Sequence, residues 1–312
     1  VMSDNVPAVD YIFRSPDVVG RDHMQATRID ETWSPKNPNF DNHVPASLPG
    51  FEDRHQECWM IKSSGTTGRP KYISLSAGQV HERLRAVAAD YHEGETRLAC
   101  FFHCTSRPYA VRALAALTSG CTILDSDDAE FLLAQHVSLV CAAPRFISGW
   151  LDTHGVCLRN THLQLSGAHV DDELAKSCLM TFGTVEDVYG SSETIKVYSN
   201  FAYVREGVLE WEGKQQHGRV EIIDPNDRTK TQSGIVRIKS PFMIEGYFHA
   251  KPGQNDVFAN GWFYPGDRAS WEKNGYLRVH GRVDDVVNLG GEKIDMKEVD
   301  SALCAISGVR QA

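Results

Sequence analysis

The chain has 312 residues, a formal net charge of −9, and hydrophobic and charged fractions of 41% and 23%. These ordinary globular values exclude disordered and fibrous classes, and the acidic balance disfavours a nucleic-acid partner, whose binding needs clustered Lys and Arg. No apolar run approaches the roughly 20 residues that span a bilayer, and no secretory signal is visible, so we expect a cytoplasmic protein without a membrane partner.

The first part of the chain predicts an irregular leader followed by an α/β unit. Repeated prolines interrupt any period in residues 1–57, because each proline fixes φ and removes a backbone donor. From 58 to 206, short apolar runs alternate with amphipathic segments. Strands are predicted at 59–61, 98–102, 121–124 and 139–142, with helices at 77–93, 109–118 and 172–180. This order predicts a mostly parallel sheet covered by helices.

The pattern changes after residue 206. Over 207–280 we predict a smaller β-rich subdomain, in which short strands are separated by turn-rich pieces. Its predicted strands are 220–223, 235–238, 262–264 and 276–280. In residues 281–312 we expect a loop over 281–295 and then a final helix that ends at Ala312.

A segment rich in Ser, Thr and Gly follows the strand predicted at 59–61. Phosphate oxygens need donors at close range: glycine lets backbone N–H groups approach, hydroxyls add donors and lysine adds positive charge. The segment is not a Walker loop, because Arg69 and Pro70 separate the second glycine from the lysine. A flexible surface loop is the alternative to a phosphate site. The predicted phosphate-binding residues are Ser63, Ser64, Gly65, Thr66, Thr67, Gly68 and Lys71.

This segment and three later motifs resemble those of the acyl-adenylate-forming (AMP-binding) superfamily, which includes acyl- and aryl-CoA synthetases and peptide-synthetase adenylation domains. Residues 189–193 are similar to its Tyr-Gly-x-Thr-Glu box. Residues 261–267 are similar to its Gly-Trp-x-x-Thr-Gly-Asp box, with Pro265 at the threonine position. Residues 281–294 resemble its hinge region. The four motifs occur in the family's order and cover the chain from about residue 58 to its end.

The resemblance implies a two-step reaction. A carboxylic acid attacks the α-phosphate of ATP, which gives acyl-AMP and pyrophosphate, and a thiol then displaces AMP. The thiol acceptor would be coenzyme A or the phosphopantetheine of an acyl carrier protein. Residues 58–206 would bind ATP and the acid, and 281–312 would be the hinge and the start of a further C-terminal domain.

The resemblance also implies roles for single residues around the nucleotide. Glu193 would bind Mg²⁺ and act in catalysis with Ser192, whose hydroxyl would donate to the α-phosphate. Tyr189 would stack on adenine beside Gly190, and Asp187 would accept a hydrogen bond from the adenine amino group.

At the other end of the nucleotide, the resemblance implies that Asp267 accepts hydrogen bonds from both ribose hydroxyls and that Arg282 lies nearby. A carboxylate matches two adjacent donors well. Taken singly, Asp267 is also compatible with a turn residue and Arg282 with a solvated surface charge.

Two segments resemble the family's acid pocket. Residues 101–103 are similar to its Leu-Phe-His segment, which gives His103 a place in the pocket and a catalytic role. An ordinary packed histidine is the alternative. Amino-acid-activating members usually carry aspartate at this position, so His103 favours an aryl or aliphatic acid. Residues 165–169 are similar to the Gly-Gly-Ala-Pro loop, in which Gly167 and Ala168 would border adenine and the acyl group.

The chain departs from the family at both ends. Family members have a longer region before the phosphate loop, and after the hinge they have a domain that supplies a catalytic lysine. The residues after Asp284 are too few for that domain, so we expect a truncated core that binds ATP and acid. Such a core would form acyl-AMP slowly or not at all, and thioester formation would need the further domain. An amino-acid adenylation domain and a non-catalytic binding module, favoured by Ser192 and Pro265, are the alternatives.

Overall fold

A computed structural model describes residues 11–14, 25–28, 55, 57–63, 71–104, 106–289 and 292–295, together with the single positions 299, 302, 303, 306 and 309. Most of the predicted leader, the interior of the predicted phosphate loop and most of the predicted final helix lie outside these residues.

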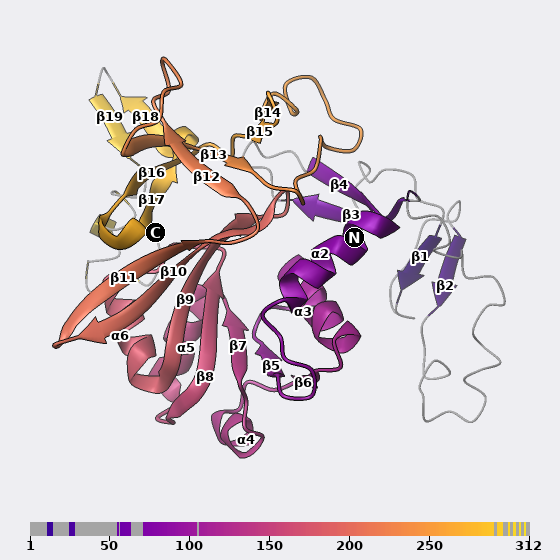
Figure 1. The fold of residues 1–312 in the computed structure, drawn as a ribbon, viewed down its shortest axis with the longest axis vertical. Coiled ribbons are helices and arrows are strands. Elements are labelled where there is room, and N and C mark those ends of the chain that lie inside the picture. The colour runs from indigo at the N-terminus through magenta and orange to yellow at the C-terminus, as the bar shows by residue number, and fades with distance from the viewer. Residues whose placement is uncertain are drawn as a thin grey trace.

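A seven-stranded sheet forms the larger part of the fold, with the strand order β11-β10-β9-β8-β7-β5-β6 (Figure 1). The strands from β5 to β9 pair in parallel, whereas β10 and β11 pair antiparallel at one edge. This mixed α/β architecture confirms the predicted fold class. The strands are β5 (Arg97–Cys100), β6 (Thr122–Leu124), β7 (Leu139–Ala142), β8 (Leu158–Ser166), β9 (Phe182–Ser191), β10 (Ile195–Arg205) and β11 (Val208–Gln215).

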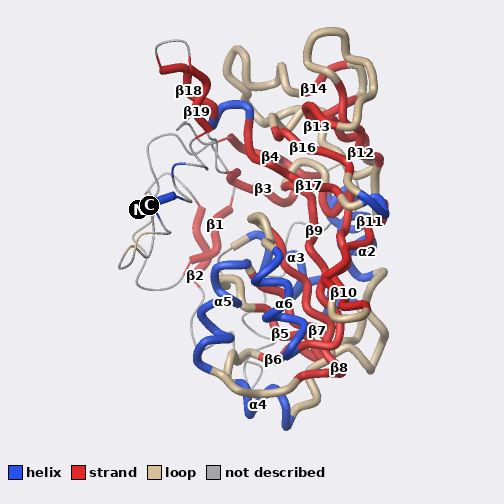
Figure 2. The backbone as a smooth tube through the Cα atoms, turned by 90° about the vertical axis from the view of Figure 1, so that its left-hand side faces the viewer, coloured by secondary structure: helices blue, strands red, loops and turns tan. Residues whose placement is uncertain are grey.

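The central strand β7 shows why the sheet has helices on both faces. All four of its residues are buried, as expected for a parallel strand covered on each side. Val140 and Ala142 join a core cluster with residues of α5 and α6, whereas Leu139 and Cys141 join a separate cluster with residues of α3. Figure 2 shows α5 and α6 side by side along the sheet.

The helices begin at residues that suit a helix N-terminus. Ser76 forms a capping box at the start of α2, and the side chains of Ser106 and Asp171 accept hydrogen bonds from backbone N–H groups of α3 and α6. The helices predicted at 77–93, 109–118 and 172–180 are confirmed as α2, α3 and α6, although α2 ends at Ala88 and not at residue 93. The described helices are α2 (Ala77–Ala88), α3 (Arg107–Thr118), α4 (Ala129–Ala134), α5 (Pro144–Thr153) and α6 (Asp172–Thr181).

A second sheet, entirely antiparallel, lies above the first in Figure 1. It contains the four strands predicted over 220–280, so a smaller β-rich part is confirmed. The predicted subdomain boundaries stay predictions, although β11 follows residue 206 and still belongs to the seven-stranded sheet. The strands of the second sheet are β12 (Arg219–Ile223), β13 (Ser233–Lys239), β14 (Phe258–Ala259), β15 (Trp262–Phe263), β16 (Asp267–Trp271) and β17 (Leu277–Arg282).

Two predictions of irregular structure are wrong where the structure describes the chain. Instead of a loop over 281–295, β17 continues to Arg282, a 3₁₀ turn covers Val283–Asp285, and β18 (Val286–Leu289) pairs antiparallel with β19 (Glu292–Asp295). Gly290-Gly291 separates these two strands in the sequence, a pair typical of hairpin turns. Within the predicted leader, β1 (Tyr11–Arg14) and β2 (Gln25–Arg28) pair in parallel; the aromatic and β-branched residues of β1 favour strand.

The remaining pair of strands, β3 (Glu57–Ser63) and β4 (Lys71–Ser76), is antiparallel and precedes α2. Its buried residues Ile61, Ile73 and Leu75 pack with Ile244 and Tyr247, which follow the second sheet's strand β13. Another 3₁₀ turn covers Lys273–Gly275. Among the described helices, none combines the length and apolar character that a membrane crossing requires.

Candidate nucleotide and acid site

The β3–β4 pair places the two ends of the predicted phosphate loop next to each other. Ser63 and Lys71 are partners in the strand register, so the segment between them starts and ends at one point. The Lys71 ammonium lies over the ring of Tyr247, 4.9 Å from its centroid, which is cation–π distance. The predicted phosphate ligands Ser64, Gly65, Thr66, Thr67 and Gly68 lie outside the described residues.

Tyr247 connects this lysine to the predicted metal ligand. Its hydroxyl donates to Oε1 of Glu193 over 2.9 Å, and the two residues are only 7% and 8% exposed. Burial, and after it the charge of Glu193, raises the pKa of Tyr247 well above its usual range. The hydroxyl therefore remains a donor and fixes one carboxylate oxygen. Sequence reasoning missed Tyr247, because it lies in none of the recognised motifs.

The turn between β9 and β10, which carries Ser192 and Glu193, is held by a buried arginine of α2. The Arg83 guanidinium donates to the backbone oxygens of Ser192 (2.9 Å) and Glu193 (3.0 Å) and also to that of Phe242. Burial lowers the pKa of Arg83 to about 9, so it is charged at neutral pH. Arg83 was not predicted either; in the sequence it looks like an ordinary charge of an amphipathic helix.

Glu193 is a suitable ligand for Mg²⁺. This ion is commonly bound by one or two carboxylates together with substrate phosphates and water, not by a closed cage of protein ligands. The described residues contain no group of three or more His, Cys, Asp or Glu that could hold a metal ion. With Tyr247 on one carboxylate oxygen, Glu193 would hold the ion with the other.

Three predicted residues from three separate motifs meet at the junction of the two sheets. The Tyr189 hydroxyl of β9 donates to Oδ2 of Asp267 over 2.6 Å, and Nη1 of Arg282 lies 3.4 Å from Oδ1. Asp267 and Arg282 are register partners in β16 and β17, and Nη2 of Arg282 also donates to the Pro265 carbonyl over 2.8 Å. Burial, and then the Asp267 charge, raises the pKa of Tyr189. The carboxylate is thus oriented from both sides.

Two further predicted residues lie on β9 itself. Burial raises the pKa of Asp187 to about 7, and the charge of the adjacent Glu186 adds to this rise. Gly190 is needed for steric reasons, because a Cβ there would lie 2.2 Å from the backbone oxygen of Ile195 and 2.9 Å from Cα of Lys196. Only glycine allows β9 and β10 to approach this closely.

A cavity of about 350 Å³ lies between α3 and the carboxyl ends of β8 and β9, the usual place for ligands in such sheets. The predicted residues Gly167, Gly190 and Ser192 line it. Gly167 has φ +96°, a backbone conformation that favours glycine. The predicted pocket histidine, His103, is exposed and does not line this cavity, and the same holds for Ala168. Their predicted roles stay predictions.

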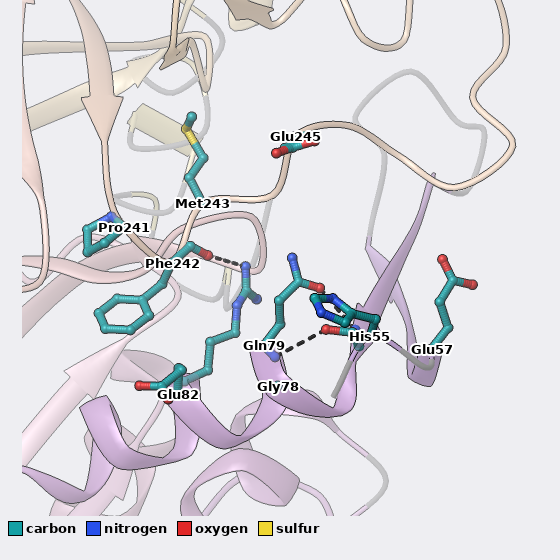
Figure 3. A pocket seen from close by; sticks show the side chains of 11 residues that line it. His55, Glu57, Gly78, Gln79, Glu82, Pro241, Phe242, Met243 and Glu245 are labelled. Carbon is teal, nitrogen blue, oxygen red and sulfur yellow. Dashed lines mark hydrogen bonds between the residues drawn. The ribbon is translucent and has the colours of Figure 1, made fainter. Parts of the chain in front are cut away.

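A larger cavity of about 920 Å³ lies between α2 and the segment 241–245 (Figure 3). Of the site residues described above, Arg83 and Phe242 also line this cavity. The residues that line it are His55, Glu57, Ser76, Gly78, Gln79, Glu82, Arg83, Pro241, Phe242, Met243 and Glu245.

The chain is similar in sequence to a known family and to known proteins. Residues 12–248 match the AMP-binding enzyme family. The vibriobactin-specific 2,3-dihydroxybenzoate-AMP ligase of Vibrio cholerae is 26% identical over 291 residues, which are 86% of this chain and 53% of that protein. The salicylyl-CoA synthase / salicylate adenylyltransferase of a Streptomyces species is 25% identical over 269 residues, 80% of this chain and 49% of that protein.

The fold matches solved structures as well. O-succinylbenzoate coenzyme A synthetase from Bacillus subtilis, in complex with ATP and magnesium ion, superposes with a TM-score of 0.75 at 18% identity, covering 97% of this chain and 65% of that one. The chain spans about half the length of the curated relatives it matches.

Proposed function

The chain belongs to the AMP-binding enzyme family, and from this we propose that it activates a carboxylic acid with ATP, as acyl-AMP with release of pyrophosphate. A complex with ATP and magnesium ion is known for a protein of the same fold, which supports these two cofactors. The relatives' names include two aryl acids, 2,3-dihydroxybenzoate and salicylate, which supports an aryl or related acyl substrate. A cytoplasmic location is part of the proposal, since that compartment supplies ATP and Mg²⁺.

Two clusters carry the proposal. In the first, Tyr189 and Arg282 contact Asp267. In the second, Tyr247 contacts both Glu193 and Lys71. A nucleoside triphosphate presents two hydroxyls on its ribose and several negative charges on its phosphates. One oriented carboxylate matches the hydroxyls, and a lysine with a metal-binding carboxylate matches the phosphates.

In the proposed reaction, a carboxylate oxygen of the acid forms a bond to the α-phosphorus while the bond to the bridging oxygen breaks. Pyrophosphate leaves with the electron pair, and no proton moves. Catalysis is then mainly positioning and neutralisation of charge. Lys71 and Ser192 would donate to the phosphates, Asp267 would fix the ribose, and Asp187 and Tyr189 would contact adenine. Mg²⁺ bound by Glu193 would neutralise phosphate charge.

Transfer of the acyl group to a thiol completes the proposal. The Streptomyces relative carries both an adenylyltransferase and a CoA synthase name, which supports coenzyme A as acceptor. A carrier-protein phosphopantetheine would present the same thiol chemistry. Mixing the chain and a pre-formed acyl-AMP with either thiol, and measuring AMP release, distinguishes the two.

The first test is calorimetric titration of ATP with and without Mg²⁺, followed by a pyrophosphate-release screen against aryl, short-chain, fatty and amino acids. We expect Mg²⁺-dependent binding that Asp267→Asn weakens at least tenfold, since a hydrogen bond to a charged group is worth about 1.5–3 kcal/mol. Asp256→Asn, at an exposed aspartate of the same half of the chain, is the matched control. Absence of Mg²⁺-dependent nucleotide binding would refute the proposal and favour the non-catalytic binding module.

A further inference from the structure

The 350 Å³ cavity contains two arginines for which the proposed chemistry of acyl-AMP formation has no evident use. Both Arg107 and Arg112 belong to α3 and line the cavity together with Ser166 and Gly167 at the end of β8. Their Cα positions are separated by roughly 7.5 Å along the helix axis, because five residues rise about 1.5 Å each. On the opposite wall, Ser192 lines the same cavity and lies at the end where the α-phosphate is proposed to bind.

Neither guanidinium contacts a carboxylate among the described residues. Nε of Arg107 is buried without any hydrogen-bond partner. Arg112 donates to uncharged groups, the Pro108 carbonyl (3.2 Å) and the Ser166 hydroxyl (3.3 Å), and its guanidinium lies 5.2 Å from the ring centroid of Phe102. Glu193 acts on Arg107 through space, but its carboxylate contacts Tyr247.

The groups around Arg112 do not supply a negative charge. Burial raises the pKa of the Cys141 thiol to about 12 and also raises the pKa values of Tyr91 and Cys100, so all three are neutral at pH 7. Burial, followed by the charge of Arg112, lowers the pKa of Arg107 to about 10. Both arginines are therefore positively charged at neutral pH, without a counter-ion among these neighbours.

Apart from the two arginines, the charged residues of the lining are Lys196 and Asp90, one of each sign, whereas Glu186 lies outside the lining. The Lys196 ammonium contacts the carboxylates of Asp90 and Glu186. The excess of positive charge in the cavity therefore comes from the two arginines of α3. A guanidinium has the planar fork that matches a carboxylate.

Building on the proposed function, we infer that the acid substrate carries a second carboxylate, which binds to Arg112 while Arg107 adds positive potential. The reacting carboxylate would then point toward Ser192, and the second would fill the helix end of the cavity. A small dicarboxylic acid, aromatic or aliphatic, satisfies both ends. A monocarboxylic acid of the same size would leave the two arginines without a partner.

The test compares acids that differ only in the second group. Benzoate, 3-hydroxybenzoate and isophthalate, and the aliphatic pair hexanoate and adipate, are titrated calorimetrically into the chain saturated with α,β-methylene-ATP and Mg²⁺. We expect each diacid to bind at least tenfold more tightly than its monoacid. Equal affinities, or an equal gain from the neutral hydroxyl, would overturn the inference while leaving the proposed function intact. Failure of the ATP analogue to bind would instead refute the proposed function.

Three variants locate the effect. Arg112→Gln is expected to remove the preference for diacids and Arg112→Lys to retain part of it, because lysine keeps the charge but not the planar fork. Arg145→Gln, at an exposed arginine of α5, is the matched control and is expected to keep the full preference. A diacid preference that survives Arg112→Gln in a variant with native unfolding behaviour would overturn the assignment of Arg112.

Discussion

The contact between Tyr247 and Glu193 allows a sharp test of how the metal-binding carboxylate is positioned. Tyr247→Phe removes a single oxygen, the donor that lies 2.9 Å from Oε1 of Glu193. The ring that lies under the Lys71 ammonium at 4.9 Å remains. The change therefore separates the hydrogen bond to Glu193 from the contact with Lys71 and from the packing of the ring against Ile73 and Leu75.

The expected magnitude follows from the burial of both partners. A hydrogen bond to a charged group contributes about 1.5–3 kcal/mol, and removing the donor leaves a carboxylate that is only 8% exposed with an unpaired oxygen. We expect the free energy of unfolding to fall by about 2 kcal/mol. Groups that orient a metal ligand are typically worth roughly 10–100-fold in metal affinity. The Mg²⁺ concentration that half-saturates ATP binding should rise by about that factor.

The measurements are urea unfolding and a Mg²⁺ titration of ATP binding at fixed ATP. Tyr72→Phe is a matched control. Tyr72 lies on β4, and its hydroxyl is buried without a hydrogen-bond partner in the described part of the chain. Its removal should leave both quantities unchanged or slightly increase stability. If the two variants shift the Mg²⁺ midpoint equally, the hydroxyl of Tyr247 does not position Glu193.

Three other changes test separate parts of the site. Arg83→Met should lower the free energy of unfolding by about 2–3 kcal/mol, because three backbone oxygens lose a charged donor and the avoided cost of burying the guanidinium offsets only part of this loss. Urea unfolding measures the change. The control Arg85→Met, at an exposed arginine of the same helix, should leave the free energy of unfolding unchanged. Because burial raises the pKa of Asp187 from 3.8 to about 7, the folded chain holds a proton that the unfolded chain loses, and stability falls as pH rises between these values. Asp187→Asn should remove that slope in unfolding series from pH 4 to 8; an unchanged slope would contradict the raised pKa. Gly190→Ala should prevent folding or cost several kcal/mol, because the new Cβ would lie 2.2 Å from the backbone oxygen of Ile195. Gly167→Ala, whose Cβ would meet no atom within 4 Å, should cost only about 1–2 kcal/mol of backbone strain. Equal losses of stability in thermal unfolding would refute the steric reasoning.

The parts of the fold that the sequence predicts well are those in which burial leaves a strong pattern. Strand β7 is four apolar residues with no polar interruption, because helices cover both of its faces. Strand β11 was missed, because it is an edge strand of which only Trp211 is buried. Its polar positions face solvent, and nothing in the local pattern shows that it adds to the first sheet and not to the second.

In the candidate site, too, some residues could be predicted from the sequence and others could not. Tyr189, Asp267 and Arg282 were found because each lies in a motif, and the structure brings them into contact. Arg83 and Tyr247 support the same site but lie outside the motifs. Their contacts join segments that are distant in the chain, such as α2 with the β9–β10 turn, and no local period encodes such a contact.

The nucleotide end of the site depends on how the two sheets are joined. Asn200 of β10, which is 1% exposed, donates to the Leu277 carbonyl over 3.1 Å and accepts from the Leu277 N–H over 3.0 Å. The Asn200 side chain thus bonds both backbone groups of Leu277 in β17, as a neighbouring strand would, at the point where the two sheets meet. The Tyr198 hydroxyl adds a 2.6 Å bond to the Gly275 carbonyl. Since β10 pairs with β9 and β17 pairs with β16, these bonds fix the distance between Tyr189 and Asp267 without a ligand. The side chains of the proposed ribose site therefore lose part of their conformational entropy during folding and not on ligand binding, as in a preorganised binding site.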